Sequence, residues 1–143
     1  MSEPEIEAIL QKAKTIASVG LSANASKPSH GIGAYLLSQG YRVIPVNPKE
    51  DSILGQKSFP NLEAIPEAID VVQVFRPSED IPPIVDQAIR IGAKAIWMQQ
   101  GIAHEEAAAK ARAAGLDVVM DRCMRTEHQR WKTARARKGN SPR

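Results

Sequence analysis

Residues 15–40 read TIASVGLSANASKPSHGIGAYLLSQG, and this stretch sets the fold class. It begins with an apolar run, Thr15–Leu21, which leads through a loop of small residues to a segment closed by Gly40. Ser29 can cap that segment as a helix, and glycine is common just past a helix end. A strand, a short loop and a helix form the repeating unit of parallel sheets. The stretch therefore predicts the first β-α unit of an α/β fold.

Four more apolar runs have the same Val- and Ile-rich, barely alternating composition, which is typical of strands covered on both faces. They are Arg42–Val46, Ile69–Phe75, Lys94–Met98 and Asp117–Met120. Helical stretches separate them, between Ser78 and Gly92, over Ala103–Ala114, and as a short or broken helix over Asn61–Ala68. This alternation predicts an α/β, Rossmann-like, doubly wound parallel five-stranded sheet, in the order 3-2-1-4-5.

Two local pairings add detail to this plan. Ser2 and Glu5 form a capping box, which predicts an added N-terminal helix. Glu106 and Lys110 are spaced to pair on one helix face.

The net charge of +3 is unevenly distributed along the 143 residues. Six basic residues and no acid lie between Arg130 and Arg143, so residues 1–129 hold 13 basic and 16 acidic side chains, a net charge of −3. We therefore predict a domain over residues 1–130 and a basic, flexible tail over 131–143. Since the basic residues, with Trp131 among them, belong to a tail and not to a structured face, the pattern does not favour a nucleic-acid partner.

Other features exclude further classes of protein. No apolar run approaches the ~18 residues of a membrane span. Glu3 and Glu5 stand where a secretory signal would carry positive charge. Cys123 is the single cysteine, which excludes an internal disulfide and most zinc-site patterns. We expect a cytoplasmic protein that binds neither a membrane nor a metal ion.

In open α/β sheets, ligands bind beyond the carboxyl ends of the strands. The loop after the first strand suits a phosphate group there, because Gly20 permits a tight exit and the next helix offers unpaired N–H groups. Lys27 and the hydroxyls of Ser22 and Ser29 can add to this cradle. Four cations are expected on the same rim: Lys27, Lys49, Arg76 and Arg122.

The dinucleotide fingerprint G-x-G-x-x-G is absent, and Asn47 and Lys49 occupy the end of the second strand where an acid would bind a ribose hydroxyl. A lysine there favours a phosphorylated ribose. The pattern disfavours NAD and leaves NADP or coenzyme A (CoA) as candidate ligands.

Several stretches together resemble the CoA-binding domain family, and most closely its stand-alone bacterial members. They are residues 16–22 (IASVGLS), 40–49 (GYRVIPVNPK), Leu54-Gly55, Asp70–Arg76, 92–101 (GAKAIWMQQG) and 119–123 (VMDRC). Relatives form the N-terminal CoA-binding domain of succinyl-CoA synthetase α subunits and of ADP-forming acyl-CoA synthetases. The resemblance covers about residues 5–130.

This resemblance implies a position for each part of CoA. The diphosphate would lie at Gly20, Leu21, Ser22 and Lys27, and the adenosine with its 3′-phosphate near Asn47, Pro48 and Lys49. Phe75 and Arg76 would flank the nucleotide, and Met98, Gln99 and Gly101 would line the path of the pantetheine arm.

No catalytic residue is expected. The synthetases work through a phosphorylated histidine in a later domain, and none of His30, His104 and His128 belongs to a triad or metal motif. His30, at a helix start, could bind ligand or cap the helix. Cys123, beside Arg122 at a strand's carboxyl end, carries the hypothesis of a mixed disulfide with CoA under oxidation.

The sequence thus predicts a protein that binds CoA or acyl-CoA without catalysis of its own. The alternatives are an NADP-dependent oxidoreductase and a subunit that supplies the CoA site to a synthetase-like chain. A protein partner or a homo-oligomer is left open.

Overall fold

The computed structural model describes residues 2–139. Five parallel strands form one sheet, which confirms the predicted α/β, Rossmann-like class. Each strand lies within or matches a predicted apolar run. The strands are β1 (Thr15–Val19), β2 (Arg42–Val46), β5 (Val71–Val74), β6 (Ala95–Met98) and β7 (Asp117–Val119).

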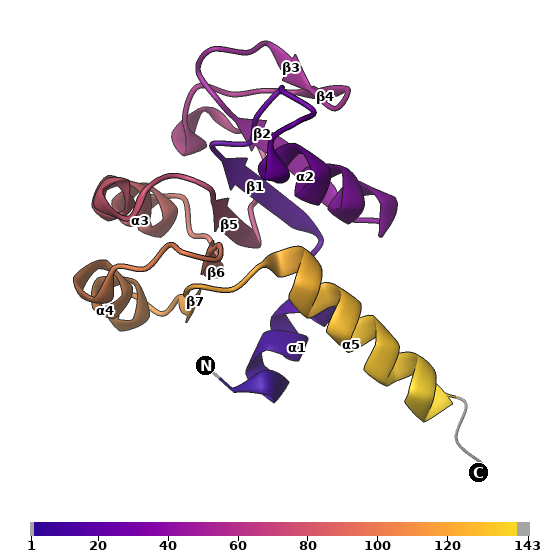
Figure 1. The fold of residues 1–143 in the computed structure, drawn as a ribbon. Coiled ribbons are helices and arrows are strands. Elements are labelled where there is room, and N and C mark those ends of the chain that lie inside the picture. The colour runs from indigo at the N-terminus through magenta and orange to yellow at the C-terminus, as the bar shows by residue number, and fades with distance from the viewer. Residues whose placement is uncertain (1, 140–143) are drawn as a thin grey trace.

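Helices cover both faces of this sheet (Figure 1). Helices α3 (Ile81–Arg90) and α4 (Glu105–Ala113) pack on one face, and α1 (Glu3–Lys12), α2 (Pro28–Ser38) and α5 (Met124–Gly139) lie on the other. Two 3-10 turns, η1 (Leu62–Ala64) and η2 (Ser78–Asp80), complete the connections. The predicted N-terminal helix is confirmed, with the Ser2 side chain accepting from the Glu5 amide.

The predicted strand order, 3-2-1-4-5, is wrong. The observed order is β2-β1-β5-β6-β7, which is 2-1-3-4-5 when the five parallel strands are counted along the chain. β5 pairs with β1, with Ile16 opposite Val71, so β2 has no full strand on its other side. Pro45 explains this: a proline lacks the N–H that a strand between two neighbours would donate, so it favours an edge strand.

The outer edge of β2 is covered by a segment that the sequence patterns did not reveal. A small antiparallel hairpin, β3 (Ser52–Ile53) and β4 (Gln56–Lys57), follows β2 and returns the chain to its edge. The Phe59 amide then donates to the Pro45 carbonyl oxygen over 3.0 Å. The chain crosses back over β1 from there to form β5.

The predicted domain boundary at residue 130 falls inside α5, and residues 131–139 are helical. Met124 at the start of α5 is fully buried, and Trp131 packs against the core formed by α1 and α2. The buried Glu127 carboxylate accepts from Arg122 and Arg130, at 3.1 Å and 3.2 Å. The rest of the predicted tail, residues 140–143, lies outside the described residues.

Two predicted side-chain interactions are also different in the structure. Lys27, and not Ser29, occupies the N-cap position of α2. Lys110 pairs with Asp86 of α3 over 2.6 Å rather than with Glu106. Tertiary contacts between helices therefore override the local i,i+4 spacing. None of the helices between residues 2 and 139 combines the length and the apolarity needed to span a bilayer.

Candidate functional site

The strand order places a switch point between β1 and β5. From β1 the chain turns to α2 and β2, whereas from β5 it turns to α3 and β6, on the other face of the sheet. The two loops therefore diverge and open a crevice at the carboxyl edge, where ligands bind in doubly wound sheets. We call this edge the rim.

Gly20 begins the first loop in a left-handed conformation with φ +88°. A Cβ added there would lie 3.0 Å from Cδ of Arg76. Both observations require glycine, since other residues are strained at this φ. The sequence prediction of a tight exit at Gly20 agrees with this geometry.

The loop is held in shape by its own polar side chains. The Ser22 amide donates to the buried Ser29 hydroxyl over 3.0 Å, and the Asn24 amide donates to the Ser22 hydroxyl over 3.0 Å. Asn24 in turn accepts from the Ser26 amide. Ser29 thus organises the loop from the first turn of α2, and its own O–H remains a donor.

The loop after β2 is tied to this first loop. The Asn47 side-chain amide donates to the Leu21 carbonyl oxygen over 3.1 Å, and its oxygen accepts from the Lys49 amide over 2.9 Å. Leu21 is fully buried and lines neither of the pockets described below, so the structure does not bring this predicted residue to the rim surface. Asn47 therefore fixes the position of Lys49 relative to the Gly20 loop.

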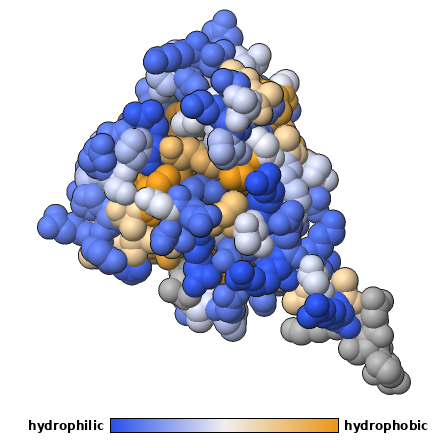
Figure 2. Space-filling model, viewed as in Figure 1, coloured by the Kyte–Doolittle hydropathy of each residue, from blue (hydrophilic) through white to orange (hydrophobic). Residues whose placement is uncertain are grey.

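Two adjoining pockets open along the rim. The outer pocket, of about 920 Å³, is lined by Asn47, Pro48 and Lys49, and by Arg76 and Asp80. The inner pocket, of about 630 Å³, is lined mainly by Ile32, Phe75, Gln99, Gln100, Cys123, Arg125 and Thr126. Gly20, Ser22 and Lys27 line both. Figure 2 shows apolar side chains near the centre of the viewed face, surrounded by hydrophilic ones.

The four cations expected on the rim differ in their availability. Lys27 and Lys49 line the pockets and form no ion pair with any described residue. Arg76 lines the outer pocket but is paired with Asp80 at 2.8 Å. Arg122 lines neither pocket; it pairs with Glu3 and Glu127 instead.

Arg125 in the first turn of α5 is a cation of the inner pocket that the sequence reading missed. Among residues 2–139 it forms no ion pair. Thr126 and Gln100 were missed as well. The signal was available, because Arg125 follows the end of the last strand by a few residues, but the predicted strand-end residues stop at Cys123.

The predicted residues at the end of β6 have separate positions. Met98 is fully buried in the core and lines neither pocket. Gly101 lines neither as well, and its amide donates to Asp121. Gln99 lines the inner pocket, where its side-chain oxygen accepts from the Met124 amide and from Gln73.

Cys123 faces the inner pocket just before α5 begins. Burial raises the pKa of its thiol, but hydrogen bonds from Thr126, from the Arg125 amide and from the Gln99 side chain outweigh burial, so the net pKa is lowered. A larger fraction of this thiol is therefore thiolate at neutral pH than in a free cysteine.

Fold and rim together define a Rossmann-like protein with two adjoining pockets at the switch point of its sheet. Residues 14–129 match the family described as "CoA binding domain", and the chain belongs to that family.

Relatives of known sequence or structure agree with this membership. Protein YneT of Bacillus subtilis (strain 168) is 40% identical over 127 residues, which are 89% of this chain and 94% of YneT. A solved hypothetical protein from Pyrococcus horikoshii OT3 is 40% identical, with a TM-score of 0.89 over 92% of this chain and 93% of its own. The ADP-forming acetate–CoA ligase II of Archaeoglobus fulgidus is 30% identical over 95 residues, 64% of this chain and 14% of the ligase.

Proposed function

We propose that this protein binds CoA or an acyl-CoA along the rim, with the nucleotide in the outer pocket and the pantetheine arm in the inner pocket. The observation that carries this proposal is the continuity of the two pockets through Gly20, Ser22 and Lys27. A long ligand with phosphates in its middle and at one end fits such an arrangement, since lysines line the junction and the outer end.

The placement of each group follows from charge. Lys49, at the outer end, would bind the 3′-phosphate of the adenosine. Lys27, at the N-cap of α2, would bind the diphosphate together with the positive end of the helix dipole. The apolar faces of Ile32 and Phe75 would contact the pantetheine arm. The end of that arm would then lie near Cys123.

The protein is proposed to bind this ligand without turnover of its own. The residues lining the two pockets include no histidine, and their single carboxylate, Asp80, is paired with Arg76. A general acid–base pair or a nucleophile with its base therefore has no support there. A role as the CoA-binding partner of a synthetase-like chain would use the same site.

Calorimetric titration tests the proposal directly. CoA and acetyl-CoA should each bind one site per chain, whereas NAD and ATP should bind far more weakly because they lack the 3′-phosphate or the arm. Binding of NADP without binding of CoA would overturn the proposal in favour of an NADP-dependent oxidoreductase.

We expect Gly20→Ala to lower the free energy of unfolding by about 1–2 kcal/mol, the strain of a left-handed residue. Gly115→Ala is the matched control, because Gly115 also has a positive φ, of +95°, but no atom lies within 4 Å of its added Cβ. Both variants should lose stability in urea unfolding, and Gly20→Ala alone should weaken CoA binding, since its Cβ displaces Arg76. Equal CoA affinity in the two variants would contradict the placement of the ligand at Gly20.

A further inference from the structure

A third pocket lies at the opposite edge of the sheet from the rim. It has a volume of about 550 Å³, within the ~300–1,000 Å³ of ligand pockets. We call it the rear pocket; it is lined by the end of α1 and by Lys14, by the turn after α2 at Gln39–Tyr41, and by α5. It shares no residue with the inner and outer pockets.

His128 of α5 is the buried polar group of the rear pocket. The residue is 5% exposed, and Nδ1 lies 2.7 Å from the hydroxyl of Tyr35, which is not part of the pocket. Nε2 forms no hydrogen bond with residues 2–137, the part of the chain whose side chains the structure describes. Every fully buried side-chain nitrogen or oxygen among the described residues has a hydrogen-bond partner. Since Nε2 has none, it is not fully buried, and it is accessible from the pocket that His128 lines.

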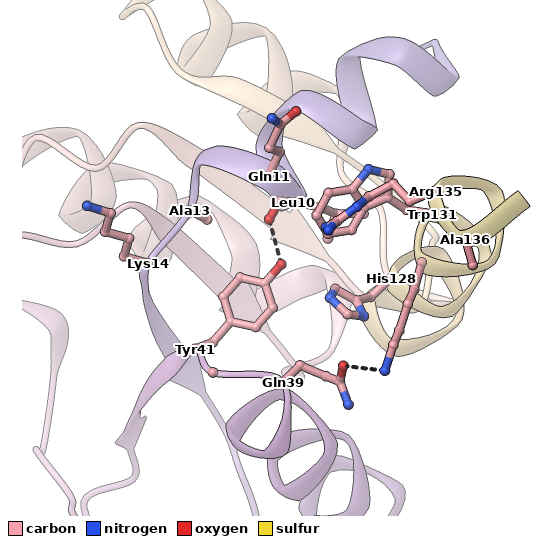
Figure 3. Close-up of a pocket in the computed structure, with 12 residues that line it drawn as sticks. Leu10, Gln11, Ala13, Lys14, Gln39, Tyr41, His128, Trp131, Arg135 and Ala136 are labelled. Atoms are coloured by element: carbon pink, nitrogen blue, oxygen red, sulfur yellow. Dashed lines mark hydrogen bonds between the residues drawn. The ribbon is translucent and has the colours of Figure 1, made fainter. Parts of the chain in front are cut away.

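Aromatic rings surround this imidazole. Tyr41 and Trp131 meet it edge to face, with ring centroids 5.5 Å and 5.4 Å away. Figure 3 shows Tyr41 from the turn after α2 and His128 and Trp131 from α5 converging on the pocket, with the Tyr41 hydroxyl bonded to Leu10. These contacts hold the imidazole in one orientation.

The charge of the rear pocket is entirely positive. Lys14, Lys132 and Arg135 line it, and no aspartate or glutamate does. Lys132 donates to Gln39 and Arg135 lies over the Trp131 ring at 4.6 Å, and neither pairs with a carboxylate among the described residues. Burial lowers the pKa of His128, and so do Lys132 and Arg135, which favours the neutral imidazole.

We infer that the rear pocket binds a small organic anion. Its carboxylate or phosphate would lie among Lys14, Lys132 and Arg135 and accept from Nε2 of His128, and its apolar body would pack against Leu10, Tyr41 and Trp131. In the tautomer in which Nδ1 accepts from the Tyr35 hydroxyl, Nε2 carries the ring proton that the anion needs. This inference does not depend on the proposed CoA site, because the two sites have no lining residue in common.

The experiment is an NMR titration of the full chain with benzoate and, separately, with phenyl phosphate. The indole N–H of Trp131 and the ring nitrogens of His128 should shift and saturate. The indole of Trp97 is an internal reference, because it is fully buried and donates to the Arg122 carbonyl oxygen. Saturation by one probe only would show whether the pocket prefers a carboxylate or a phosphate. Saturation by both would show that a negative charge is sufficient for binding.

Lys14→Ala and Arg135→Ala should each weaken binding by about tenfold or more, the loss of one charge-assisted contact. Arg112→Ala, which removes an exposed arginine of α4 away from the pocket, is the matched control and should leave the affinity unchanged. No saturation by either probe at millimolar concentration would overturn the inference; the cations would then serve the C-terminal dipoles of α1 and α2. Equal affinity in all three variants would overturn it as well.

Discussion

Lys49→Ala is expected to weaken CoA binding by about 10- to 100-fold and to leave the binding of dephospho-CoA nearly unchanged. One charge-assisted contact to a phosphate contributes about 1.5–3 kcal/mol, which corresponds to that range. Dephospho-CoA lacks the 3′-phosphate, so it has no contact to lose. Calorimetric titration of both ligands into both proteins measures the four affinities.

Lys27→Ala is the control variant for this prediction. Lys27 lines both pockets at their junction, where both ligands would place a diphosphate. Its loss should weaken CoA and dephospho-CoA equally. If Lys49→Ala also weakened the binding of both ligands equally, the 3′-phosphate would not lie at Lys49. The proposed orientation of the ligand along the rim would then be wrong.

A second large effect is expected at Cys123. With CoA disulfide, the Cys123 thiolate should attack one sulfur, form a protein–CoA mixed disulfide and release the other half as CoA thiolate. Intact mass should then increase by one CoA unit in the wild type and not at all in Cys123→Ser, since Cys123 is the single cysteine. Because the thiol pKa is lowered, the rate should reach its plateau at a lower pH than for free cysteine.

Oxidised glutathione distinguishes a directed reaction from general thiol reactivity. It has no adenosine or diphosphate to bind the rim, so it should modify Cys123 much more slowly than CoA disulfide. Lys49→Ala should slow the CoA reaction towards that rate. Equal rates with both disulfides, or no adduct with CoA disulfide, would refute the placement of the arm at Cys123.

The fold class could be predicted because it depends on short-range patterns. Apolar runs such as Arg42–Val46 identify buried strands wherever their neighbours lie, and capping residues such as Ser2 mark helix starts. Strand order depends on which strand edges pair after long crossover connections. The predicted order, 3-2-1-4-5, was therefore wrong although the five strands were identified. Pro45 did carry information about the order, because its missing N–H favours an edge strand.

The candidate site was partly predictable for a similar reason. Gly20, Lys27 and Lys49 lie in the loops that follow β1 and β2, so the sheet brings them to one rim. Arg125 and Thr126 lie at the rim because α5 packs back on the sheet. No local sequence pattern predicts this packing. Met98 sits at a strand end too, yet its side chain points into the core.

The doubly wound α/β class, with Gly20, Lys27 and Lys49 at the carboxyl edge of the sheet, could be predicted from sequence alone, because strand patterns and loop residues act locally. Which cations are paired with carboxylates became clear from the three-dimensional structure. Asp80 pairs with Arg76 in the turn after β5, and Arg122 pairs with Glu127 of α5 and, from the other end of the chain, with Glu3 of α1. The packing of α5 also brings His128 beside Tyr41, residues 87 positions apart, and so creates the rear pocket.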